Sequence, residues 1–170
     1  MCCDSENDLI TGIYSSMNDC TEVPPPHFFA ERAILAARNN DIRSLNSTIL
    51  AHLPGDERTY FSADSFSLEG PAAEENYTNI PVEFLHTLNA SGLPIAELRL
   101  KVGCPVILLR NIDPKRGLCN GTRATVVRMS NRLLEIRLIT GDHAGETALI
   151  PRITLSPSLT AIDFTIKLSR

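Results

Sequence analysis

The sequence lacks the motif by which P-loop proteins hold a nucleoside triphosphate. That loop ends in a Gly-Lys pair, because glycine lets backbone N–H groups wrap a phosphate while lysine neutralises it. None of the nine glycines here precedes a lysine. The Asp56-Glu57 pair follows Pro-Gly instead of an apolar strand, so we read it as a solvated turn and not as a magnesium site. We therefore expect no nucleotide-hydrolysing site within these 170 residues.

Long apolar runs are also missing. The longest is CPVILL, six residues from Cys104, whereas a membrane-spanning helix needs roughly 20. The first residues, MCCDSENDLI, carry acids where a secretory signal has a basic start. We therefore expect an intracellular protein without a membrane partner.

Motifs for metal binding and nucleophilic catalysis are absent as well. The five cysteines form no C-x-x-C pair, and none has a histidine at ligand spacing. The four histidines have no Ser or Cys nucleophile at a recognisable motif spacing, and His143, in a glycine-bounded loop, is expected to be exposed without a function. We therefore expect the cysteines to be reduced thiols. We also expect no metal site and no catalytic residue in this chain.

What the chain does have is an uneven distribution of charge. Residues 1–95 hold 4 Lys and Arg against 14 Asp and Glu, whereas residues 96–170 hold 12 against 6. Such asymmetry indicates a basic face for an anionic partner, or two halves that attract each other. The basic half has no Trp and only one aromatic residue, Phe164, so contact with a nucleic acid would be mostly to phosphates and not by stacking.

The first half of the chain alternates between helix and strand signals. Apolar residues from Leu9 to Met17 recur at helical spacing after an acidic turn, and TEVPPPH then predicts an extended linker. The run 33–37 predicts a buried strand, followed by a helix capped by Asn39 or Asn40. The apolar face of this helix would comprise Ile42, Leu45, Ile49 and Leu53.

A second strand at 59–61 would complete a β-α-β unit of a parallel sheet. The acidic, aperiodic stretch 66–79 predicts a mobile loop, and a helix is expected over 81–92, with Pro81 in its first turn and Gly92 as its stop.

After Pro94 the pattern changes to short strands. Four runs, VGCPVILLR, TRATVVRM, RLLEIRLIT and ETALIPRI, are joined by turn signals, and DFTIKLS predicts a fifth strand. Five short strands at close spacing favour a small antiparallel barrel, closed or partly closed, over a sandwich. The predicted fold class is α+β, with domains at 1–27 (helix and linker), 28–92 (β-α-β) and 93–170 (barrel).

The residues between the first two of these strands form the candidate binding site. They are basic or rich in amide and hydroxyl groups, and comprise Arg110, Asn111, Lys115, Arg116, Asn120, Gly121, Thr122 and Arg123. Backbone amides in a left-handed turn can form an anion-binding nest. Turn chemistry alone favours the simpler interpretation, that Asn120-Gly121 only makes a hairpin turn.

Several stretches in one order resemble the C-terminal part of the PIF-one-type (petite integration frequency) DNA helicases, with fungal and Helitron members most similar. They are ILAARNNDIRSLN, LPGDERTYFSADS, PVEFLHTLNASGLP, LRLKVGCPVILLRNIDPKRGLCNGTRATV and HAGETALIPRITLSPS, within residues 28–170. The resemblance implies part of the second RecA-like domain (2A), followed by the SH3-like 2B domain of an ATP- and Mg-dependent helicase that moves 5′ to 3′ on single-stranded DNA.

By this resemblance Arg38, Asn39 and Asn46 would face the DNA and nucleotide cleft, and Arg110, Asn111, Asn120 and Thr122 would belong to the signature that opens the barrel. The family's phosphate loop, magnesium-binding acids and final motifs are missing from these residues. We therefore expect a non-catalytic module without ATP or metal.

The expected activity is weak, sequence-independent binding of single-stranded nucleic acid. The alternative is a protein-interaction module, in which an unpaired sheet edge binds a second copy or a helicase. The nucleus is the expected location, with the mitochondrion as the alternative.

Overall fold

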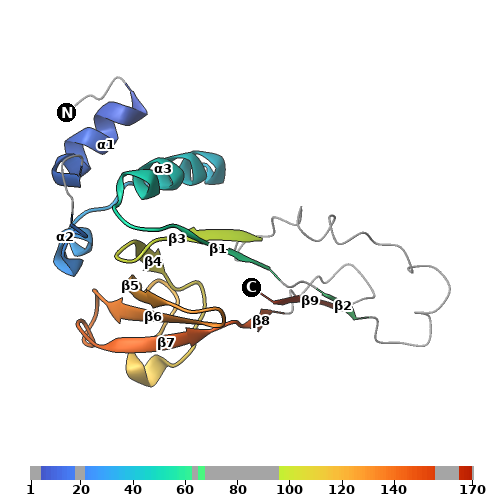
Figure 1. The fold of residues 1–170 in the computed structure, drawn as a ribbon. Coiled ribbons are helices and arrows are strands. Elements are labelled where there is room, and N and C mark those ends of the chain that lie inside the picture. Colours follow the sequence, from blue (N-terminus) through green and yellow to red (C-terminus); the bar gives the residue numbers. More distant parts are fainter. Residues whose placement is uncertain (1–4, 18–21, 63–64, 68–95, 156–164, 170) are drawn as a thin grey trace. The chain divides into compact units, whose positions relative to one another are not determined.

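A computed structural model describes residues 5–17, 22–62, 65–67, 96–155 and 165–169 (Figure 1). The contacts define two compact units, Met1–Arg58 with Leu100–Ile150, and Thr59–Arg99 with Pro151–Arg170. The predicted helix at 81–92 and most of the predicted loop at 66–79 lie outside the described residues, and the predicted domain boundaries stay predictions. Within the described ranges no helix is both long enough and apolar enough to cross a membrane.

The predicted N-terminal helix is confirmed. α1 spans Glu6–Tyr14 and continues into a 3-10 turn, Ser15–Met17 (η1). Ser5 begins it as the N-cap, where its hydroxyl accepts the Asp8 N–H at 3.2 Å. The residues buried are Ile10, Tyr14 and Met17, which belong to the predicted apolar face.

The prediction that the prolines form only an extended linker is wrong. A short helix, α2 (Pro26–Ala30), begins at the last of the three prolines, with Pro25 extended before it. Proline suits the first turn of a helix, because the N–H that it lacks would have no partner there. The helix buries Phe29 completely.

The next helix is confirmed, but its predicted cap is wrong. α3 spans Asn39–His52; Arg38 takes the N-cap position, and no side chain caps the helix. Of its predicted apolar face, Leu45 and the C-cap residue Leu53 are buried, whereas Ile42 is exposed. The chain therefore enters α3 without the Asn cap that would normally fix its start.

The predicted β-α-β unit is not formed in the described residues. Residues 32–36 have no regular secondary structure, and Leu35 is 94% exposed, so the expected buried strand at 33–37 is wrong. The predicted strand at 59–61 does exist as β1 (Arg58–Phe61), but it pairs with β3 (Glu97–Leu100). An apolar run is buried only where neighbouring elements cover it, and the described residues supply none here.

Four of the predicted strands form one sheet in chain order. These are β4 (Pro105–Ile107), β5 (Arg123–Met129), β6 (Leu133–Leu138) and β7 (Thr147–Pro151). β4 pairs with β5 and β5 with β6 in antiparallel register, with a bulge between Val126 and Arg128. The second half of the chain therefore folds mainly as antiparallel sheet, as predicted.

The fifth predicted strand does not close this sheet. β9 (Thr165–Ser169) pairs instead with β2 (Ser65–Ser67) and β8 (Thr154–Leu155) in a separate three-stranded sheet. β2 also occupies two residues of the predicted mobile loop. The architecture is α+β with open antiparallel sheets, and no closed barrel is formed in the described residues.

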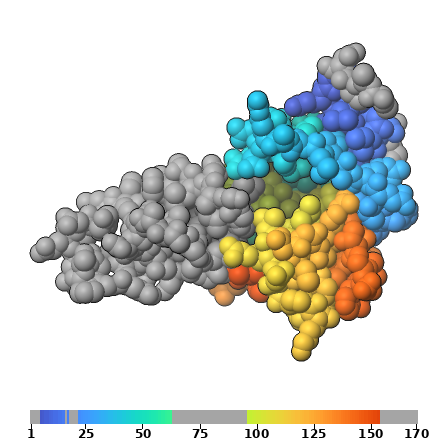
Figure 2. Space-filling model, turned by 180° about the vertical axis from the view of Figure 1, so that it is seen from behind, coloured from blue at the N-terminus to red at the C-terminus, as the bar shows by residue number. Residues whose placement is uncertain are grey.

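One face of the β4–β7 sheet makes the main core. The sequence of β6 alternates between the two faces of the sheet: Ile136 and Leu138 are almost fully buried and Arg137 is exposed. With them pack Leu108, Leu118, Ala124 and Ala148. Of the helices, α2 contacts this sheet at β5, and in Figure 2 blue residues of the N-terminal part lie against the orange residues.

Candidate nucleic-acid interface

The loop between β4 and β5 is built around a 3-10 turn, η2 (Pro114–Arg116). Gly117 ends the turn in the left-handed region at φ 74°, which favours glycine. A Cβ at this position would lie 2.8 Å from the Cδ2 atom of His143, so the histidine ring fits here because glycine has no side chain. The loop therefore has one defined conformation that presents Lys115 and Arg116.

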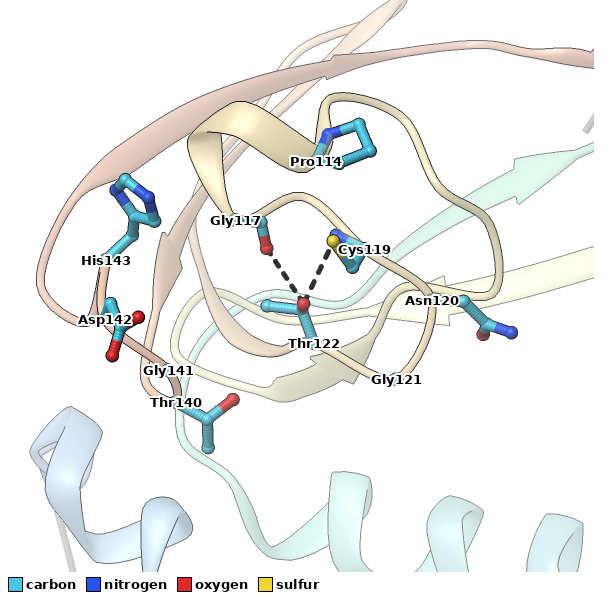
Figure 3. A pocket seen from close by; sticks show the side chains of 10 residues that line it. All are labelled: Pro114, Gly117, Cys119, Asn120, Gly121, Thr122, Thr140, Gly141, Asp142 and His143. Atoms are coloured by element: carbon cyan, nitrogen blue, oxygen red, sulfur yellow. Dashed lines mark hydrogen bonds between the residues drawn. The ribbon is translucent and has the colours of Figure 1, made fainter.

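Two residues of the predicted site hold this loop together. The Oδ1 atom of Asn111 accepts the Asn120 N–H at 2.8 Å. The Thr122 hydroxyl donates to the Gly117 carbonyl at 2.9 Å and accepts the Cys119 N–H at 3.3 Å (Figure 3). Asn111 and Thr122 thus stabilise the conformation of the loop by hydrogen bonds within it.

The predicted anion-binding nest is not formed. Gly121 has φ 88°, and the Thr122 N–H donates to the Cys119 carbonyl at 3.1 Å, which is the hydrogen bond of a type II turn. The Gly121 N–H donates to Leu108 at 2.8 Å, and the Asn120 N–H is taken by Asn111. These amides already have acceptors, so they are not available to an anion. The simpler interpretation, that Asn120-Gly121 only makes a turn, is therefore the correct one.

The three cations of the loop are the exposed part of the predicted site. Arg110, Lys115 and Arg116 are all exposed, and none of their side chains makes a hydrogen bond or ion pair within the described residues. Side chains without internal partners keep their donors available for phosphate oxygens.

Arg123 is used differently. Its guanidinium donates to three backbone carbonyls: Phe29 and, at 3.2 Å, Ala30 at the end of α2, and Arg32 just after it at 2.8 Å. The side chain is half-buried, and these bonds commit three of its five donors. Its predicted role as a nucleic-acid contact competes with this internal one, which sequence reasoning missed.

The residues that the resemblance places in the motor cleft lie on another element. Arg38 precedes α3, Asn39 begins it and Asn46 lies two turns further on; all three are exposed. No hydrogen bond or ion pair in the described residues joins them to the loop. Hydrogen bonds therefore link members of the loop from Arg110 to Thr122 with one another, but none in the described residues links them with Arg38, Asn39 or Asn46.

An open pocket of about 460 Å³ lies beside this loop (Figure 3). Its lining residues are Pro114, Gly117, Cys119, Asn120, Gly121, Thr122, Thr140, Gly141, Asp142 and His143. The sequence did not indicate Thr140, Asp142 or His143, because they come from the turn after β6. His143 is only partly exposed, and its Nδ1 atom lies 3.1 Å from the Glu146 carboxylate, so it is more enclosed than predicted.

Comparison with known proteins shows that part of the chain is similar to a known domain. Residues 83–129 match the family model "DNA helicase Pif1, 2B domain". The chain is 32% identical over 105 residues to "ATP-dependent DNA helicase PIF1" of Danio rerio, a match that covers 59% of this chain and 14% of the zebrafish protein.

Solved structures agree in fold. Bacteroides Pif1 bound to ssDNA has a TM-score of 0.52 at 18% identity and covers 98% of this chain, which spans 33% of that one. A structure of two coordinating Pif1 helicases at forked dsDNA has a TM-score of 0.54 at 18% identity, covering 98% of this chain and 30% of that one. The closer likeness to fungal members stays a prediction. Residues 83–129 are thus similar to the 2B domain of Pif1-type DNA helicases, and the fold of the chain resembles that of about a third of the length of the solved Pif1 chains.

Proposed function

We propose that this chain is a non-catalytic, helicase-derived module that binds single-stranded nucleic acid weakly and without sequence preference. The β4–β7 sheet would be the counterpart of the SH3-like 2B domain, and the loop from Arg110 to Thr122 its binding surface. The observation that carries the proposal is the set of three exposed cations, Arg110, Lys115 and Arg116, on a loop that Asn111 and Thr122 hold together by internal hydrogen bonds.

The physical argument for low specificity is the kind of donor that remains. Lysine and arginine side chains contact phosphates irrespective of sequence, whereas reading a base needs further directed groups or stacking rings. The basic half contains only Phe164 for stacking. One of the solved relatives, Bacteroides Pif1, is bound to ssDNA.

The non-catalytic part of the proposal depends on the printed sequence. It contains no Gly-Lys pair to cradle a triphosphate, and nucleotide hydrolysis needs positioned charges on both sides of the phosphates. On this proposal the chain uses neither ATP nor magnesium, and its place of action is the nucleus.

The test is a titration of a fluorescent single-stranded oligonucleotide at several salt concentrations. We expect log K to fall linearly with log salt, with similar affinity for oligonucleotides of unrelated sequence. Absence of binding at low salt, or an affinity that follows the sequence, would contradict the proposal. Magnesium- and DNA-dependent ATP hydrolysis that a substitution in this chain abolishes would overturn its non-catalytic part.

A second candidate is a protein-interaction module. Ile107 and Leu149 are 56% and 58% exposed on β4 and β7, the two edge strands of the sheet. Unpaired edges with apolar side chains favour association with another chain. Sedimentation velocity that shows a defined oligomer, together with no response to oligonucleotide, would favour this candidate over the first.

A further inference from the structure

The short helix α2 depends on residues outside itself. A helix leaves its last four carbonyls without intrahelical donors, and five residues are too few for a helix that is stable alone. Here Arg32 donates to the Phe28 carbonyl at 3.2 Å, while Arg123 donates to those of Phe29 and Ala30. Two arginines thus satisfy the end of α2, and one of them comes from the sheet.

The side chains of α2 hold it from the other side. Phe28 and Phe29 meet edge to face at 5.2 Å between ring centroids, and Tyr14 of α1 lies 6.0 Å and 6.4 Å from these two rings. The Arg32 guanidinium lies 4.5 Å from the Phe28 ring centroid. α2 is therefore placed between an aromatic contact with α1 and a polar contact with β5.

The segment before α2 also contacts the turn that precedes β4. A Cβ on Gly103 would lie 2.0 Å from Cγ1 of Val23, so the valine fits only because this position, at φ 85°, is glycine. By contrast α3 is tied separately, since Lys101 donates to the Leu53 carbonyl at 2.7 Å. Residues 22–32 and α3 thus have independent attachments.

We propose that Arg123 is a latch for residues 22–32: when its three hydrogen bonds are lost, this segment leaves the sheet as a unit, while the β4–β6 strands and α3 stay folded. Cationic donors at the C-terminal end of a helix favour the closed state, in which residues 22–32 lie on the sheet, because the partial charge at that end of the helix is negative. The latch fixes the start of residues 33–38, which lead to α3 and carry the exposed Leu35. It is independent of the proposed function.

The test is hydrogen exchange, measured by mass spectrometry, on the full chain and its Arg123→Ala variant. We expect the amides of α2 to exchange at least about tenfold faster in the variant, with those of β5 and β6 unchanged. Arg123→Lys should lie between the two proteins, because lysine keeps the charge but not the planar fork.

Arg137→Ala is the matched control. Arg137 pairs with Thr125 in the register, so it lies on the same face of the sheet as Arg123, but it is exposed and has no partner in the described part of the chain. The latch is wrong if α2 exchanges equally in Arg123→Ala and the parent, if Arg137→Ala has the same effect, or if β5 and β6 are released together with α2.

A measurement on the unaltered protein covers the case in which Arg123→Ala does not fold. In low urea, the α2 amides should exchange through an opening of lower free energy than that of β5 and β6. The same free energy for all three elements would mean that residues 22–32 do not open as a separate unit, which contradicts the latch.

Discussion

The loop of residues 110–116 and the first residue of β5 both present basic side chains and lie close together in the sequence, but the structure uses these side chains in opposite ways. The side chains of Arg110, Lys115 and Arg116 are exposed without partners in the described residues. The Arg123 side chain instead donates three hydrogen bonds, two to carbonyls of α2 and one to the Arg32 carbonyl. A count of positive charge therefore overestimates the binding surface. What decides a cation's role here is whether the fold supplies it with acceptors.

The largest effect on stability is expected from Arg123→Ala. It leaves the Phe29, Ala30 and Arg32 carbonyls without their donor, and we expect the free energy of unfolding to fall by about 2–3 kcal/mol. Urea denaturation would measure this change. Arg137→Ala should stay within about 0.5 kcal/mol of the parent, and equal losses would erase the contrast between internal and exposed cations.

A comparable contrast is expected between the buried thiol of Cys104 and the partly exposed thiol of Cys119. Burial raises the pKa of Cys104 from 9.0 to about 11, so the folded protein holds this proton more tightly than the unfolded chain does. Its contribution to stability is fully present below pH 9 and is lost as the pH rises to about 11, a loss of roughly 2–3 kcal/mol. Urea denaturation across this pH range should show a clearly smaller loss in Cys104→Ala than in the parent. A remainder is expected, because burial also raises the pKa of Tyr14 above its usual value of 10.

Reaction with an aromatic disulfide reagent offers a second readout. Cys119 lines the pocket and is partly exposed, whereas Cys104 is buried. At pH 8, mass spectrometry should find Cys119 labelled and Cys104 intact in the folded chain. Labelling of both at the same rate would mean that Cys104 is not enclosed by the fold.

A smaller effect is expected from Asn111→Ala. The substitution removes the acceptor of the Asn120 N–H in an exposed loop, which should cost about 1 kcal/mol. Nucleic-acid affinity should fall as well, although Asn111 need not touch the ligand, because the loop loses its fixed shape. Asn111→Asp keeps the acceptor oxygen, so a stability like that of the parent would confirm the hydrogen bond as the cause.

The sheet was predictable because its signals are local. Alternation of Ile136, Arg137 and Leu138 gives the two faces of β6, and Asn120-Gly121 gives the turn before β5. The opposite holds for α2 and Arg123, whose hydrogen-bond partners are 91 to 94 residues apart in the chain. No spacing rule along the sequence reports such a contact.

Failures in the first half have a similar origin. The run at 33–37 has the composition of a buried strand, but burial depends on covering elements, and Leu35 is exposed in the structure. The candidate site was predicted as one list, yet Asn111 and Thr122 stabilise the loop and Arg123 holds α2. Residue type indicated the loop correctly but not which members face outward.

The most direct test compares two triple variants in the oligonucleotide titration. One replaces Arg110, Lys115 and Arg116 by alanine, and the other replaces Arg132, Arg137 and Arg152, which are also exposed, so that both lose three charges. We expect the slope of log K against log salt to become shallower by about 2 in the loop variant, because each lost phosphate contact on a single strand removes about 0.7. The control variant should keep the parent slope; equal slopes in the two variants would contradict the loop as the binding surface.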